Sequence, residues 1–475
     1  QKKTAPKTNV VTSRAINCAP ASQNRVLQFN NVSAYIENSG LLWYNKSRGR
    51  GSYFVPKDAG TAPIYAGGLW MGGVDATNQL KLAAIRFRSA GNDYWPGPLT
   101  SIPGSGNGLT KRDFGPAETE AAVCAEWDKF FVITRQEVEQ FRSWYQCNLD
   151  PLCDASVDFP GYALPASITD WPAHGDVSKF QDYYIAPFYD NDGDGTYDPA
   201  NGDYPWYDIE EEVDCRTSRQ VTLFGDYTIW WIFNDKGNIH TESGGEPIGM
   251  EIRGQAFSFA TNDEINDMTF YNYELINRST QTLFNTYFGQ NVDTDLGCAQ
   301  DDYVGCDVGR GLGYAFNADA TDDNCSNGAT PYGANPPAIG IDFFEGPYQD
   351  NDGVANPFFK NGSPNFLTEA VPGNGIGYGD SVVDNERFGM RRFVYYNNNR
   401  GNTGDPTNQI EHYNYLKGLW KDGVKFQYGG NAYPGSGSPY SMSGVDCDFM
   451  FPSDPATGEN TDPEGWGTGG NIAVT

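Results

Sequence analysis

The feature that most constrains the fold is a recurrence of short runs that alternate apolar and polar residues or are rich in aromatic residues. Gly, Pro, Asn or Asp bounds each run, and side chains of a β-strand point alternately to the two faces of a sheet, so these runs predict strands. They lie at 33–44, 64–74, 80–87, 130–134, 220–233, 249–260, 269–276 and 282–292. We expect a mainly β fold of sandwich-like antiparallel sheets, with long Gly/Asn/Asp-rich loops and one or two short helices.

Turn residues between neighbouring runs predict two hairpins. The runs 269–276 and 282–292 are separated by the polar residues Asn277 to Thr280, which can reverse the chain. A second turn is predicted at Asp75 to Gln79, between the runs 64–74 and 80–87.

The sequence carries one well-marked helix start. Thr134 can cap the first amides, and Glu137, three residues later, completes a capping box. This helix is expected to run to about Tyr145. A weaker helical pattern follows Pro116 and reaches Trp127.

The length of 475 residues is sufficient for two packed β-domains. We assign residues 1–25 to an extended leader and 452–475 to a polar tail or linker. Residues 26–215 are expected to form an N-terminal β-rich domain with a helical insertion and a calcium loop. Residues 216–451 are expected to form a second β-rich domain with long loops.

The net charge of −29 constrains the partners, because it repels nucleic acid and favours contact with divalent cations. Nine cysteines without a CxxC pair, and only three histidines, favour disulfides over a zinc or haem site. Cys147 and Cys153 are close enough to close one loop, and Cys298, Cys306 and Cys325 share one loop-rich stretch. With no apolar run of about 20 residues, we expect a secreted protein that is extracellular or on the outer cell surface.

The acidic run that begins at Asp190 predicts a calcium site. It reads DNDGDGTYD, so carboxylates occupy positions 1, 3, 5 and 9, and a glycine at position 6 permits a sharp turn, as in the first half of an EF-hand loop. Position 12 is Asn201 rather than the usual closing Glu. The predicted Ca²⁺ ligands are Asp190, Asp192, Asp194, the carbonyl of Thr196, Asp198 and, to complete the shell, Asp203. The alternative is an Asx-turn loop with solvated acids.

A shorter version of the same pattern occurs at Asp350-Asn351-Asp352-Gly353, followed by Asn356. We predict that Asp350 and Asp352 form part of a second calcium site, with a solvated acidic turn as the alternative.

Two adjacent tryptophans are the candidate ligand-binding residues. Trp230 and Trp231 are neighbours on a predicted strand, so one ring faces the core and the other faces outward or into a second layer. An outward ring could stack on a sugar, whereas core packing is the alternative for both.

No catalytic residues are assigned. Acids are abundant near aromatic residues, but there is no GxSxG motif, and the histidines are expected to form structural hydrogen bonds. A non-enzymatic protein is therefore favoured.

Several segments carry a family resemblance. They are IYAGGLWMGGVDATNQLKLAAIRFR with NDYWPGPL (64–99), ITDWPAHGD (168–176), APFYDNDGDGTYDPANGDYPWY (186–207), FNDKGNIHTESGGEPIGMEIRGQAF (233–257) and VDTDLGCAQDDYVGCDVGRGLGYAFN (292–317). Together these segments resemble the N-terminal region of large surface proteins of Bacteroidota that the type IX secretion system exports. The resemblance implies passage across the outer membrane, a signal peptide removed before Gln1 and a C-terminal sorting domain, but it supplies no catalytic residues.

The leading hypothesis is a calcium-stabilised, non-enzymatic exoprotein that serves in adhesion, in extracellular matrix or filaments, or in glycan contact. The alternatives are a secreted polysaccharide hydrolase and a cargo or component of a type IX secretion or gliding complex. The expected partners are an outer-membrane secretion protein or another surface protein, a glycan, or further copies of the chain.

Overall fold

The fold is taken from a computed structural model of the chain. It describes residues 17–86, 91–103, 112–214, 216–323, 325, 328–358, 369–370, 373, 375–436 and 444–452. Most of the expected leader, residues 1–16, and the expected tail from residue 453 lie outside the described residues.

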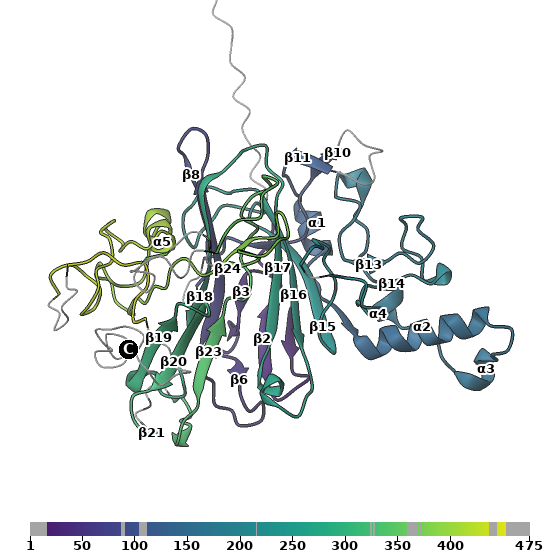
Figure 1. Cartoon of the computed structure of the whole chain (residues 1–475), viewed down its shortest axis with the longest axis horizontal. Helices are drawn as coiled ribbons and strands as arrows, with labels where there is room; N and C mark the ends of the chain where they lie inside the picture. Colours follow the sequence, from purple (N-terminus) through teal and green to yellow (C-terminus); the bar gives the residue numbers. More distant parts are fainter. Residues whose placement is uncertain are drawn as a thin grey trace, which may run out of the picture.

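Two antiparallel sheets form the centre of the molecule (Figure 1). The first sheet has the order β1-β2-β3-β7-β18, with β6 paired to β2 and β8 paired to β7. Its strands are β1 (Asn24–Leu27), β2 (Ser33–Glu37), β3 (Leu41–Leu42), β6 (Tyr53–Phe54), β7 (Ala66–Val74), β8 (Leu80–Ala83) and β18 (Phe284–Asp293). The second sheet has the order β12-β15-β16-β17, with β9 paired to β15. Its strands are β9 (Trp95–Pro96), β12 (Phe131–Thr134), β15 (Tyr227–Asn234), β16 (Met250–Ser258) and β17 (Phe270–Asn277).

The smaller sheets lie outside this pair. One has three strands, β19 (Asp302–Asp307), β20 (Leu312–Asn317) and β23 (Ala338–Asp342). The two-stranded pairs are β4 (Tyr44–Asn45) with β5 (Arg50–Gly51), β10 (Ser101–Pro103) with β11 (Arg112–Pro116), β13 (Phe188–Tyr189) with β14 (Tyr204–Pro205), β21 (Thr321–Asp322) with β22 (Gly333–Ala334), and β24 (Gly375–Ile376) with β25 (Arg387–Phe388). The predicted mainly β, sandwich-like fold is therefore confirmed.

Short helices flank the sheets. They are α1 (Ala121–Glu126), α2 (Arg135–Leu149), α3 (Ala155–Asp158), α4 (Ala166–Thr169), α5 (Gln409–Leu416) and the 3₁₀ turns at Val177–Lys179, Pro199–Asn201, Glu264–Asp267 and Ala299–Asp301. The predicted capping box is present, because the Thr134 hydroxyl accepts from the Glu137 amide at 3.1 Å and the Glu137 carboxylate accepts from the Thr134 amide at 2.9 Å. Helix α2 continues past the predicted end at Tyr145 to Leu149. The weaker helix after Pro116 is present as α1, but it begins only at Ala121.

Three apolar layers hold the sheets and their coverings together. The first lies between the two large sheets and contains Leu69 and Met71 of β7 with Ile229, Trp231 and Phe233 of β15. On the outer face of the second sheet, Trp230 and Ile232 of β15 pack against α2 and residues around 168–207. On the outer face of the first sheet, Trp70 of β7 packs against α5 and residues up to 451. Figure 1 shows these coverings on opposite sides of the central strands.

One predicted hairpin is correct and the other is wrong. Strands β7 and β8 pair across Asp75 to Gln79, where the Asp75 amide donates to the Gln79 carbonyl at 3.0 Å. Strands β17 and β18, however, do not pair with each other, because β17 pairs with β16 and β18 pairs with β7. The polar residues from Asn277 to Thr280 therefore carry the chain from one sheet to the other.

The sheets cross the predicted domain boundary at residues 215/216. Strands β9 and β12 precede it and pair with β15 after it, and β18 returns to β7. The predicted boundary therefore does not coincide with a division between sheets.

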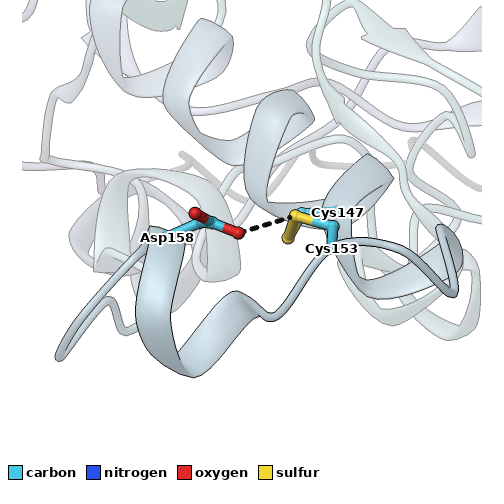
Figure 2. Close-up of side chains that lie close together, drawn as sticks. All are labelled: Cys147, Cys153 and Asp158. Carbon is cyan, nitrogen blue, oxygen red and sulfur yellow. Dashed lines mark hydrogen bonds between the residues drawn. A yellow bond between two sulfur atoms is a disulfide. The ribbon is translucent and has the colours of Figure 1, made fainter.

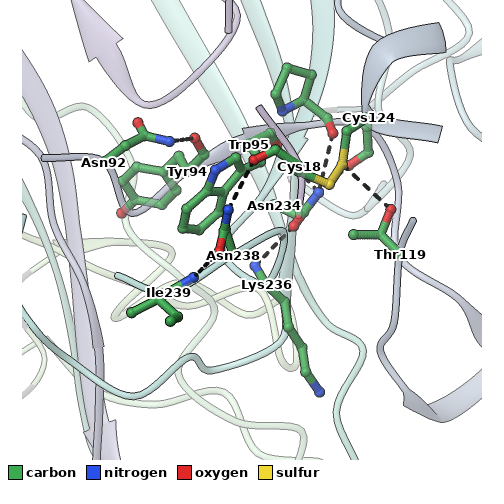
Figure 3. The surroundings of a disulfide bond; sticks show 12 residues. Cys18, Asn92, Tyr94, Trp95, Thr119, Cys124, Asn234, Lys236, Asn238 and Ile239 are labelled. Atoms are coloured by element: carbon green, nitrogen blue, oxygen red, sulfur yellow. Dashed lines mark hydrogen bonds between the residues drawn. A yellow bond between two sulfur atoms is a disulfide. The ribbon is translucent and has the colours of Figure 1, made fainter. Parts of the chain in front are cut away.

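Three disulfides tie the described residues. Cys147 pairs with Cys153 as the spacing predicted, Cys298 pairs with Cys325, and Cys18 pairs with Cys124 across a sequence separation of 106. Cys306 and Cys447 are free and buried. Figure 3 shows the surroundings of the Cys18–Cys124 bond, where the amide of Asn238 donates to the Cys18 carbonyl at 3.2 Å. The segment before β1 is thus fastened to α1.

A buried ion network joins the second sheet to the residues outside it. The Glu251 side chain on β16 is fully buried, and its Oε1 lies 2.8 Å from Arg278 Nη2 and 3.1 Å from Arg253 Nη2. Its Oε2 accepts from the Leu99 amide at 3.0 Å, and Arg278 also pairs with Asp182 at 2.7 Å. Burial acts to raise the pKa of Glu251, but the two guanidinium groups outweigh it and lower that pKa.

Substitution of Glu251 by Gln is expected to lower the free energy of unfolding by about 3–5 kcal/mol, because it removes the one fully buried counter-charge of two guanidinium groups and leaves them only the more exposed Asp182 and Glu274. Because the folded-state pKa of Glu251 is lowered, its stabilisation is present above its ordinary value of 4.5 and is lost as the pH falls below it. Urea denaturation at pH 7 and at pH 4 measures both effects.

The matched control for this substitution is Glu274→Gln. Glu274 pairs with Arg253 at 3.4 Å but is 36% exposed, so the expected loss is about 0–1 kcal/mol. Equal losses in the two variants would contradict the role assigned to Glu251.

Candidate calcium loops

The first predicted calcium loop connects β13 and β14. These two short strands pair Phe188 with Pro205 and Tyr189 with Tyr204, so the ends of the loop are held side by side. Gly193 and Gly195 adopt φ values of +73° and +78°, a conformation that glycine adopts without the steric cost of a side chain. The alternating sequence can therefore fold back on itself within a few residues.

Three of the predicted ligands converge in this loop. One carboxylate oxygen from each of Asp190, Asp192 and Asp194 lies within 4.8 Å of the others. The two oxygens of Asp190 accept from the amides of Gly193 and Gly195, both at 2.8 Å. Backbone N–H groups thus fix the carboxylates in a cluster that matches the oxygen chemistry of a hard cation such as Ca²⁺.

The other three predicted ligands of this loop have different contacts. The Thr196 hydroxyl, which is not the carbonyl predicted to bind the ion, accepts from the Tyr183 hydroxyl at 3.3 Å. Asp198 caps a 3₁₀ turn by accepting from the Ala200 amide at 2.9 Å. Asp203 is fully buried, and its two oxygens accept from the amides of Asn191 at 2.9 Å and Asp198 at 2.8 Å. Burial raises the pKa of Asp203. Asp203 therefore holds the backbone of the loop at Asn191 and Asp198.

His174 supports the same loop from outside it. Its Nε2 accepts from the Tyr197 amide at 2.7 Å, so Nδ1 carries the proton and donates to the Tyr183 carbonyl at 3.1 Å. Burial lowers the pKa of His174, which favours this neutral form. The expected structural role of this histidine is consistent with these bonds.

The second predicted loop gains a residue that its sequence pattern did not contain. Asp350 and Asp352 lie with Asp384 in a cluster whose ligand atoms are within 4.8 Å of one another. Asp384 is distant in sequence and follows no spacing rule, so only the fold could identify it.

A third group of side chains has the spacing of a metal site but not its chemistry. Cys147, Cys153 and Asp158 lie together, and Cys153 Sγ is 3.2 Å from Asp158 Oδ2 (Figure 2). Both sulfurs belong to a disulfide, so neither is a thiolate that could ligate a metal.

The proposed sugar contact at the adjacent tryptophans is wrong. Trp230 is 1% exposed and Trp231 is 0% exposed, because β15 has an apolar layer on each face. Trp231 also lies directly over Gly254, where an added Cβ would be 2.6 Å from the indole. Neither ring can reach a glycan.

The three histidines of the chain are all engaged within the structure. Both ring nitrogens of His240 face backbone carbonyls, of Leu82 at 2.8 Å and of Asp235 at 2.5 Å. His412 is fully buried against Trp70, and burial lowers its pKa to about 3. His174 holds the loop at residues 190–203, and these contacts keep each imidazole inside the fold.

A surface hollow between α2 and residues 158–165 brings two acids near aromatic rings. Glu137, Asp158, Phe159 and Tyr162 are among its lining residues. The Glu137 carboxylate already accepts from Thr134 and from the Ser167 hydroxyl at 2.8 Å. This acid therefore serves the start of α2.

Comparison with known proteins found no matching family model, no matching curated protein and no matching solved structure. Among the described residues, no helix has the length and apolar character needed to cross a membrane.

Substitution of Trp231 by Ala is expected to cost about 3–5 kcal/mol of stability, because it opens a cavity in the layer between the two sheets. Denaturant unfolding measures the loss. Phe344→Ala is the control, since this ring is 62% exposed and its removal is expected to cost about 0.5 kcal/mol. A Trp231→Ala variant as stable as the wild type would contradict the buried position.

Proposed function

We propose that the chain is a calcium-stabilised, non-enzymatic extracellular protein that presents a β-rich surface for adhesion, for matrix or filament building, or for glycan contact. The observation that carries the proposal is the convergence of Asp190, Asp192 and Asp194 in a loop already folded by backbone hydrogen bonds. Three like charges held this close repel one another unless a cation lies between them.

The disulfides and the negative net charge of the chain support an extracellular location. Disulfides persist in oxidising compartments, and three of them connect described residues. The net charge of −29 is tolerated more easily where calcium is abundant, because bound Ca²⁺ offsets part of the self-repulsion.

Support for a non-enzymatic role comes from the groups that could have carried catalysis. All three histidines are engaged inside the fold, and the charged Glu251 carboxylate is paired with two guanidinium groups in a buried ion network. These groups stabilise structure, so the surface of the sheets and loops is the part left for function.

A secreted polysaccharide hydrolase is the second candidate, and the hollow with Glu137 and Asp158 is the observation that favours it. Such an enzyme needs two carboxylates across a sugar-binding groove. Release of reducing sugar that the wild type produces and Asp158→Asn does not would support this candidate over the first.

The resemblance to type IX secretion substrates supplies the proposed route to the cell surface. The corresponding partner is an outer-membrane component of that system, and self-association is the expected behaviour of a filament or matrix protein. Cross-linking on intact cells followed by identification of the captured protein distinguishes these partners.

Removal of calcium is expected to loosen residues 190–203 more than the strands of the two large sheets, because the strands keep their own hydrogen-bond ladders. Hydrogen exchange in the presence of calcium and after chelation measures this difference. A ligand present at about 100 times its Kd adds about 2.7 kcal/mol to the free energy of unfolding. Removal of calcium is therefore also expected to lower the melting temperature.

The control is the double variant Asp192→Asn/Asp194→Asn. It retains the Asp190 carboxylate that accepts from the Gly193 and Gly195 amides, so the loop keeps those bonds. Exchange at residues 190–203 is expected to be independent of calcium in this variant. Wild-type exchange that is unchanged by chelation would overturn the proposed calcium site.

A further inference from the structure

Three exposed apolar side chains lie at the far end of the arm that α2 and α3 form, residues 135–158. Leu149, Leu152 and Val157 are 67%, 94% and 69% exposed. Figure 1 shows α2 projecting from the sheets, with α3 at its far end. A group of exposed apolar side chains on such a projection is typical of a surface that contacts another protein.

Covalent and hydrogen bonds fix this end of the arm. The Cys147–Cys153 disulfide closes the loop that carries Leu152. The Asp154 carboxylate caps α3 by accepting from the Ser156 amide at 3.0 Å. A surface that is already ordered loses less conformational entropy on binding, so these bonds favour association.

Acids surround the apolar side chains of the arm. Asp150, Asp154 and Asp158 are exposed, and none of them forms an ion pair with Lys or Arg in the part of the chain that the structure describes. Residues 143–158 contain no Lys or Arg. The chemistry of this surface therefore selects a partner that offers both positive charge and apolar area.

The chain itself carries such a surface at the turn between β4 and β5. Residues 38–57 contain basic residues and no acid, although the chain as a whole has a net charge of −29. Lys46, Arg48 and Arg50 of this segment are exposed. The partly exposed rings of Tyr44 and Tyr65, whose centroids are 5.3 Å apart, adjoin the turn and add apolar area.

Local hydrogen bonds hold the basic turn in shape. The Asn45 side chain accepts from the amides of Ser47 and Arg48, both at 3.1 Å. The Tyr65 hydroxyl donates to the Gly49 carbonyl at 3.4 Å. The turn is therefore ordered before any partner binds, as the end of the arm is.

Acids adjoin the basic turn but leave its arginines unengaged. Glu37 pairs with Lys46 at 2.8 Å, and the acids at 293 and 295 lie near the Tyr65 hydroxyl. The two arginines of the turn form no ion pair among the described residues. They are thus available to carboxylates of another molecule.

The basic turn and the end of the arm lie on different parts of one copy. Tyr44 packs against the layer between the two large sheets, whereas α2 covers the outer face of the second sheet. The two surfaces therefore meet between copies and not within one. A contact between two different surfaces gives an open chain of copies unless its rotation closes a ring.

We propose that the basic turn of one copy, residues 44–51, docks on the apolar and acidic end of the arm of a second copy. The two arginines of the turn pair with acids of the arm, and the tyrosine pair covers the exposed leucines. The proposal rests on the self-association proposed above and names the surfaces that carry it. The contact joins opposite charges, so it lets copies of a strongly acidic chain approach one another.

Sedimentation velocity of the full chain in calcium-containing buffer, over a range of protein concentrations, tests the contact. The wild type is expected to associate. Arg48→Glu/Arg50→Glu and Asp150→Lys/Asp158→Lys are each expected to weaken association at least about tenfold, because like charges then face each other. Asp154 is left in place because its carboxylate caps α3.

Reversal of the charges on both surfaces gives the decisive comparison. A chain with all four substitutions has acids in the turn and bases on the arm, so it is expected to regain association. An equimolar mixture of the two double variants is expected to regain it as well, because each then meets a surface of opposite charge. Failure of both to recover would overturn the proposed pairing.

The apolar part of the contact has its own matched control. Leu149→Ser/Leu152→Ser is expected to weaken association at least about tenfold, because it removes the apolar centre of the interface. Ile239→Ser, at a residue that is 69% exposed in another part of the chain, is expected to leave association unchanged. Equal effects would assign the association to apolar exposure in general and overturn the role of the arm.

Cross-linking of the wild type with a carbodiimide keeps the test decisive if a variant fails to fold. This reagent joins a lysine amine to an adjacent carboxylate, so linked peptides that contain Lys46 and residues 150–158 are expected in the associated fraction. Links from the lysines of residues 1–16 to the arm in their place would overturn the basic turn as the occupant. A wild type that stays monomeric would overturn the contact but not the calcium site, which is tested separately by exchange at residues 190–203.

Discussion

Strand β15 is buried on both faces, and the other parts of the fold are arranged around this constraint. Its odd-numbered apolar residues, from Ile229 to Phe233, complete the layer between the two large sheets, and Trp230 and Ile232 pack under the helical insertion. A strand with two apolar faces cannot lie at a solvent-exposed surface of a sheet, because burial of both sides is its main source of stability. The insertion between β12 and β15 is therefore part of the core, and the sheets continue across the middle of the sequence.

The features that the sequence predicted correctly depend on residues within a few positions of each other. The capping box at Thr134, the turn after β7 and the Cys147–Cys153 disulfide are all local, so spacing was sufficient. The predicted hairpin between β17 and β18, which the structure does not contain, shows the limit of such local patterns. A polar turn between two apolar runs permits pairing, but it does not show which neighbour offers the better apolar face. The prediction that Trp230 or Trp231 faces outward was wrong for the same reason. Alternation predicts that a strand has two faces, but it does not predict what covers each face.

The two acidic loops show the same division at the level of the site. Asp190, Asp192 and Asp194 follow a pattern that is complete within six residues, so the sequence placed them together. Asp384 carries no such pattern, and it lies with Asp350 and Asp352 only because residues 349–356 and 380–388 are neighbours in space. Both acidic loops are irregular, lie next to strand pairs of only two residues each and are rich in acids. Cations can then provide a cohesion that apolar packing does not.

The Cys18–Cys124 disulfide has a mechanical consequence for the N-terminal part of the chain. Tension applied to the chain before Cys18 passes through the sulfur–sulfur bond to α1, because the covalent link is the shorter path. The enclosed residues, which include β1, β2 and β7, carry none of the pull along the chain. The strands of the first sheet that lie between Cys18 and Cys124 therefore cannot be pulled off one by one from that end, whereas β18, which lies outside this loop, remains on the path of the force.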